Sequence, residues 1–174
     1  MESDEEQPQR PTAVLFVYSW DLLLAILALF GVLAPFAGGL VVSGQPVSLP
    51  LAVQIVAALS SAAYAAVLII VASLLTRRRR WVRNIQIITL VVAVALAGIS
   101  VVVQQVTGAH VELGSILVTL LFALVDLLVI VLMTERRVVT WYVEPGAAPR
   151  YATGALAFWA LTGCALVITE AVIR

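Results

Sequence analysis

Five long runs of apolar residues divide this sequence, and they constrain its fold more than any other feature. A helix needs roughly 20 consecutive apolar residues to cross the hydrocarbon core of a bilayer. We therefore predict membrane-spanning helices over residues 13–37, 51–75, 85–106, 113–133 and 152–173. The fifth run is rich in Ala, Gly and Thr, so a bundle of four spans is the fallback.

Long valine-rich stretches such as residues 88–103 also suit β-strands. The strands of a membrane barrel, however, alternate apolar and polar residues over about ten positions. The runs in this chain are longer and continuously apolar, which favours helices. Only 11% of the residues are charged, against about 25% in a soluble domain. The sequence thus predicts an all-α, polytopic integral membrane helical bundle.

The distribution of arginine predicts how the chain is oriented. Arginines gather in the links after the second and fourth runs, and the other two links contain none. The positive-inside rule then predicts a cytoplasmic N-terminus, and a C-terminus outside if all five segments span. Aromatic residues near the same links are expected at the membrane interface, namely Trp81, Trp141, Tyr142 and Tyr151.

The first residues of the chain differ from the rest in composition. Residues 1–12 are acidic and polar, whereas a signal peptide begins with a basic segment. We expect a disordered cytoplasmic tail there, followed by a single transmembrane domain over residues 13–174. All ten basic residues are arginine, and we expect the membrane to be a bacterial cytoplasmic (inner) membrane.

Two carboxylates interrupt the apolar runs at nearly the same depth. Asp21 and Asp126 each lie about eight residues from the predicted cytoplasmic end of their helix, or roughly 12 Å. A carboxylate at the centre of a span costs about 2.5–3.5 kcal/mol, so neither is expected to face lipid. Polar residues at similar level or on the same face complete a predicted intramembrane proton or packing site: Asp21, Asp126, Gln86, Ser115 and Thr119.

This predicted site has three interpretations. The acids could be packing or assembly groups that form hydrogen bonds across helices or to a partner subunit. They could instead form a proton or cation site, because intramembrane acids are functional candidates by default. A third interpretation is the binding of a lipid or small molecule. The sequence leaves open whether Asp21 and Asp126 meet, since it does not give the order of the helices around the bundle.

The run "RRRRWVR" has two interpretations that can hold together: it is a topology signal, or it binds anionic lipid headgroups. Basic clusters beside a span attract anionic lipid headgroups by about 1 kcal/mol for each residue. The predicted headgroup contacts on the cytoplasmic side are Arg77, Arg78, Arg79, Arg80 and Arg83.

The chain is poor in the residue types that catalysis and metal binding require. One cysteine and one histidine exclude an intrachain disulfide and a multi-histidine metal site, and we expect no cofactor or metal. No catalytic or phosphate-binding motif is present, and the net charge of zero implies no nucleic-acid partner. We expect a small non-enzymatic membrane protein that binds other membrane subunits or its own copies, as an accessory or assembly subunit of a larger complex. The alternative is a small oligomeric proton-coupled transporter or channel that uses Asp21 and Asp126.

Overall fold

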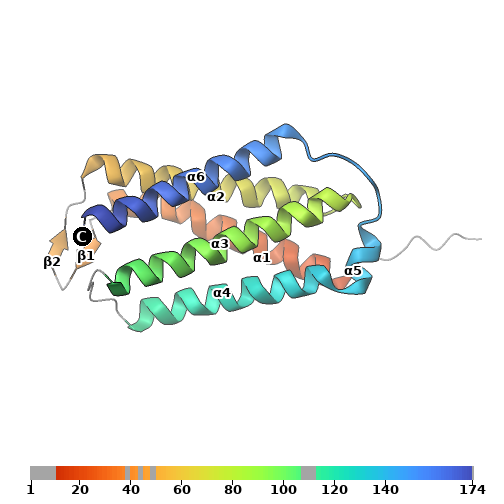
Figure 1. The fold of residues 1–174 in the computed structure, drawn as a ribbon, viewed down its shortest axis with the longest axis horizontal. Helices are drawn as coiled ribbons and strands as arrows, with labels where there is room; N and C mark the ends of the chain where they lie inside the picture. The colour runs from red at the N-terminus through yellow and green to blue at the C-terminus, as the bar shows by residue number, and fades with distance from the viewer. Residues whose placement is uncertain (1–10, 38–39, 43–44, 48–49, 107–112, 174) are drawn as a thin grey trace, which may run out of the picture.

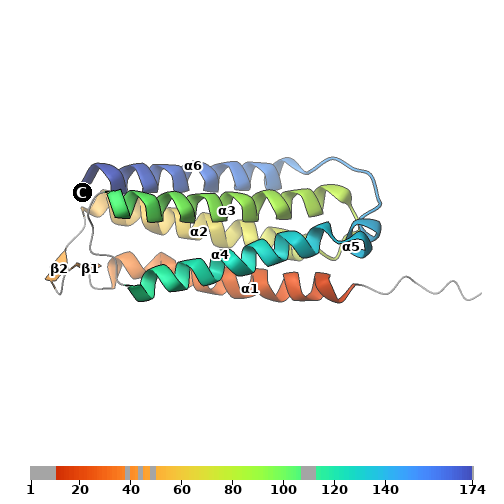
Figure 2. The same ribbon diagram turned by 60° about the horizontal axis from the view of Figure 1, so that its bottom comes forward.

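Five long helices run along one common axis and make up almost the whole molecule (Figures 1 and 2). The computed structural model describes residues 11–37, 40–42, 45–47, 50–106 and 113–173. The elements are α1 (Thr12–Leu33), η1 (Ala34–Phe36), β1 (Leu40–Val42), β2 (Gln45–Val47), α2 (Leu51–Leu74), α3 (Arg80–Val106), α4 (Leu113–Thr134), α5 (Arg136–Trp141) and α6 (Arg150–Ile173).

The five long helices α1, α2, α3, α4 and α6 are each long and apolar enough to cross a membrane. The predicted fold class is therefore confirmed, and α6 makes the fifth span. Proline lies at three of the boundaries of the membrane-spanning helices. Pro11 and Pro50 precede the first residues of α1 and α2 with extended backbone angles, and Pro35 lies in the 3₁₀ turn that ends the first span. Because proline has no N–H to donate, it suits the start of a helix and interrupts a continuing one.

The two ends of the bundle differ in charge. Every arginine that the structure describes lies at the end formed by the start of α1, the link 75–79, α5 and the segment 142–149. We call this the arginine-rich end (Figure 1). At the opposite end, β1 and β2 form a small antiparallel hairpin in which Leu40 pairs with Val47. The sequence did not predict this hairpin, and we call this the hairpin end.

Two predicted boundaries are corrected by the structure. α3 begins at Arg80, five residues before the predicted residue 85, so part of the arginine run is helical. The first turn of α3 packs against the rest of the protein, since Trp81 and Val82 are only 7% and 1% exposed. Thr12 belongs to α1 and not to the predicted tail, while residues 1–10 lie outside the described part of the chain.

The helices follow one another around the bundle in the order α1, α2, α6, α3, α4. α1 packs along α2, α2 along α6, and α3 lies between α6 and α4, whereas α4 meets α1 only over a small area. Small residues allow two of the close approaches. A Cβ atom added to Gly31 would lie 3.2 Å from the Ser61 hydroxyl of α2, and one added to Gly163 would lie 2.7 Å from the Leu96 side chain of α3.

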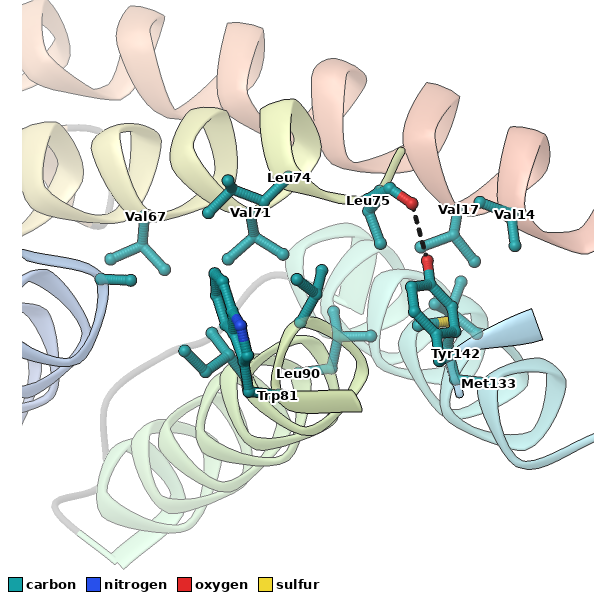
Figure 3. Packing of buried hydrophobic residues seen from close by; sticks show 14 of the residues in the cluster. Val14, Val17, Val67, Val71, Leu74, Leu75, Trp81, Leu90, Met133 and Tyr142 are labelled. Atoms are coloured by element: carbon teal, nitrogen blue, oxygen red, sulfur yellow. Dashed lines mark hydrogen bonds between the residues drawn. The ribbon is translucent and has the colours of Figure 1, made fainter. Parts of the chain in front are cut away.

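Buried apolar side chains concentrate in the half of the bundle next to the arginine-rich end (Figure 3). Among residues whose exposure is described, α1 has no buried side chain after Ala25 and α3 has none after Leu90. On α4 the first buried residue is Asp126. These three helices therefore share a closed core only in the arginine-rich half.

The two arginine-rich links are tied to each other by main-chain hydrogen bonds. The Arg80 amide donates to the Glu144 carbonyl at 3.1 Å, and the Glu144 amide donates to the Arg78 carbonyl at 3.0 Å. Beside them, the Tyr142 hydroxyl donates to the Leu75 carbonyl at 2.9 Å, which caps the end of α2 (Figure 3). The link after α2 and the segment before α6 thus form one braced unit.

The orientation of the bundle remains a prediction that labelling can test. We expect Arg79→Cys, in a background where Cys164 is replaced by Ser, to react with a membrane-impermeant maleimide only from the cytoplasmic side. Gln105→Cys lies near the hairpin end, is exposed, and should react only from the outside. The opposite pattern would overturn the positive-inside assignment.

Candidate functional site

Asp21 lies in the core of the bundle and is fully buried. It belongs to the buried stripe of α1, whose other members are all apolar: Val14, Val17, Leu24 and Ala25. Their three- and four-residue spacing places them on one helical face, so the fold of α1 turns the acid inward. There the side-chain amide of Gln86 on α3, also fully buried, donates from Nε2 to Asp21 Oδ1 at 2.8 Å.

Asp126 is bound to the same helix by a second hydrogen bond. The indole Nε1 of Trp20 donates to Asp126 Oδ1 at 2.8 Å, and the Trp20 ring also contacts Phe122, one turn away on α4, with ring centroids 5.7 Å apart. Asp126 is only 6% exposed and starts the buried stripe that continues with Val129 and Met133. The neighbouring residues Trp20 and Asp21 therefore connect α1 to α4 and to α3.

The two carboxyl groups belong to one cluster. Trp20 and Asp21, which bind Asp126 and Gln86, are neighbours on α1, and the Tyr64 side chain of α2 packs with Trp20 against the same buried residues of α1 and α2. Tyr64 in turn stacks on Trp159 of α6, with ring centroids 4.6 Å apart. Each of the five membrane-spanning helices thus contributes a polar or aromatic side chain at this level.

Three buried oxygen atoms in the cluster have no hydrogen-bond partner: Asp21 Oδ2, Gln86 Oε1 and Thr89 Oγ1. Thr89 lies three residues after Gln86, on the same face of α3. A buried polar atom without a partner typically costs about 1–3 kcal/mol, and more when it is charged. The cluster can therefore accept a proton or a small cation without displacing an existing bond.

The structure brings together three of the five predicted site residues. Asp21, Gln86 and Asp126 come together, which the sequence could not establish. Thr119 lies two turns from Asp126 toward the hairpin end of α4, and the Ser115 side chain lies outside the described part of the structure. The predicted list omitted the aromatic donor Trp20 and the neighbouring residues Tyr64 and Thr89. Of these, Thr89 could have been identified from the sequence, because it lies three residues after the intramembrane amide Gln86 and so on the same helical face.

The cluster lies at a seam between two groups of helices. α1, α2 and α6 pack extensively on one another, and α3 packs along α4. Both hydrogen bonds of the acids cross from α1 to the second group, where α1 otherwise makes little contact. No described arginine hydrogen-bonds to either acid, so the bonds from Gln86 and Trp20 hold the carboxylates alone.

All five arginines predicted to contact headgroups lie at the arginine-rich end. Arg77, Arg79 and Arg80 are exposed, whereas Arg78 and Arg83 are half-buried. Trp81 and Tyr142, expected at the membrane interface, are instead buried within the protein, where both belong to the cluster of buried apolar side chains. Tyr151, at 57% exposed, has the outward position that the sequence predicted.

Within the described ranges, no three His, Cys, Asp or Glu side chains are grouped so that they could share a metal ion. Comparison of the sequence with known protein families and curated proteins, and of the fold with solved structures, finds no match. The class of the protein is therefore defined by its fold and by the carboxylate cluster alone. It is an integral membrane helical bundle with two hydrogen-bonded carboxyl groups buried between its helices.

Proposed function

We propose that this chain is a small membrane transporter or channel in which Asp21 and Asp126 take up and release protons. The observation that carries the proposal is the Asp21 carboxyl group, which is fully buried in a membrane-spanning helix with one oxygen unpartnered. A bare carboxylate at this depth is costly, and no described arginine hydrogen-bonds to it. Uptake of a proton removes the charge.

Proton uptake would also change the bond that joins α1 to α3. An ionised carboxylate only accepts hydrogen bonds, whereas a protonated one also donates through its O–H. The Gln86 amide can form a hydrogen bond with either protonation state of Asp21, since it carries both a donor and an acceptor. Because this bond crosses the seam, exchange of the proton couples to the packing of the two helix groups.

Proton flux into sealed vesicles tests the proposal. The purified protein is reconstituted with a pH-sensitive dye inside the vesicles, and a potassium gradient with valinomycin drives proton entry. We expect acidification with the wild-type chain, and a rate equal to that of empty vesicles with Asp21→Asn. Asn keeps the size and the acceptor oxygen of the side chain but cannot exchange a proton.

Glu144→Gln serves as the matched control, because Glu144 is an exposed acid at the arginine-rich end and outside the cluster. This variant should conduct like the wild type. Flux that survives in both Asp21→Asn and Asp126→Asn would contradict the proposal, and so would a wild-type rate no higher than that of empty vesicles.

A second candidate function is an accessory or assembly subunit. It is favoured by the hairpin-end halves of α3 and α4, where no described residue is buried within the chain. Such surfaces suit either lipid or the helices of a partner. Purification of the tagged protein in mild detergent, followed by mass spectrometry, separates the two functions. A stoichiometric second protein would support the subunit role, and a pure homo-oligomer would support the transporter.

A further inference from the structure

A cleft opens at the arginine-rich end between the start of α1, the end of α4 and α5. Its lining residues lie at the start of α1, near the end of α4 and in α5, where two membrane-spanning helices begin or end, so we expect its mouth at the level of the lipid headgroups. This cleft does not include the carboxylate cluster, and its role does not depend on proton uptake.

The lining of the cleft changes from apolar to polar toward the end of the bundle. Phe16 lies one turn inside α1, and Leu132 lies two residues before the end of α4, so the deeper side is apolar. Arg78, Arg137 and Thr140 line the outer side. An amphipathic molecule with a phosphate at one end and hydrocarbon at the other matches this order.

Arg78 is held in place before any ligand arrives. Its guanidinium carbon lies 4.8 Å from the centre of the Trp141 ring, and its Nε donates to the Trp141 carbonyl at 3.4 Å. This arrangement leaves the two terminal nitrogens of the guanidinium free of protein hydrogen bonds in the described chain. A positioned arginine loses less side-chain entropy when it binds a phosphate.

The charges in the cleft select the headgroup. Arg78 and Arg137 outnumber the single acid in the lining, Glu135. A zwitterionic headgroup brings its own cation into this positive site, whereas an anionic headgroup does not. We propose that the cleft binds one anionic phospholipid, with its phosphate between Arg78 and Arg137 and its acyl chain along Phe16 and Leu132.

Native mass spectrometry of the full chain tests this site. The protein is released from nanodiscs that contain phosphatidylglycerol and phosphatidylcholine in equal amounts, and the retained lipids are counted. We expect one phosphatidylglycerol on the wild-type chain. In titrations with the same lipid, Arg78→Gln with Arg137→Gln should weaken binding about thirtyfold, since each lost arginine contributes about 1 kcal/mol.

Arg77→Gln with Arg80→Gln is the control, because it removes the same charge from the same end but not from the cleft. This pair should retain the lipid. Arg137→Gln alone leaves the contact between Arg78 and Trp141 intact and should weaken binding about fivefold, so a folding defect in the double variant cannot hide the result. Equal losses in both double variants would overturn the cleft in favour of a general attraction to arginines. Equal retention of phosphatidylcholine would overturn the selection by charge.

Discussion

Tyr142→Ala is expected to lower the free energy of unfolding by about 3–5 kcal/mol, as for other buried aromatic residues replaced by alanine. The Tyr142 side chain is 1% exposed and fills the space between the links at the arginine-rich end. Its hydroxyl also donates to the Leu75 carbonyl at the end of α2. The measurement is the midpoint of denaturant-induced unfolding in mixed micelles, followed by tryptophan fluorescence.

Two further variants separate the ring from the hydroxyl. Tyr142→Phe keeps the ring and leaves the Leu75 carbonyl without this donor, which should cost about 1–2 kcal/mol. Tyr151→Ala removes an exposed tyrosine from the same end and should change stability by less than about 0.5 kcal/mol. If Tyr151→Ala destabilised the protein as much as Tyr142→Ala, the braced links would not be the source of stability.

Gln86→Leu is expected to lower the free energy of unfolding by about 3 kcal/mol, because it strands the buried Asp21 carboxyl group. Adding Asp21→Leu should restore most of that loss. When both partners of a buried polar pair become apolar, no unsatisfied group remains. The same unfolding measurement gives the coupling free energy between the two positions.

Asn84→Leu provides the control for this cycle. Asn84 is an exposed amide on α3, two residues before Gln86, and its replacement should change stability little. A double variant no more stable than Gln86→Leu alone would show that the two side chains act independently. The Asp21–Gln86 bond would then not hold α1 against α3.

Hydropathy and residue counting predicted much of the fold and the depth of the site. A span is set by the thickness of the bilayer, so the length of each apolar run places its ends. Counting at 1.5 Å per residue from those ends put Asp21, Gln86 and Asp126 near one level, where the structure brings them together. The same count could not choose partners for the acids, because α6 inserts between α2 and α3 around the bundle.

The arginine-rich end was the least predictable region. Polar residues there could face water or pair with one another, and hydropathy does not distinguish the two. The bonds between Glu144 and the backbone of Arg80 and Arg78 join residues 64 and 66 positions apart in the sequence. Trp81 and Tyr142 are buried in the core next to that pairing, and α5 is a helix too short to leave a periodic signal.

The confinement of the closed core to one half of the bundle gives the helices a mechanical property. α3 has no described buried residue after Leu90. Its last 16 residues, about 24 Å long, lie beyond a base fixed in the core and are held by partly buried contacts such as that between Leu96 and Gly163. A tilt of about 5° at that base would move the far end by about 2 Å. The bond between Gln86 and Asp21 lies one turn before Leu90, in the fixed part of α3. A small change in that bond would therefore move the hairpin end of α3 more than any other part of the helix.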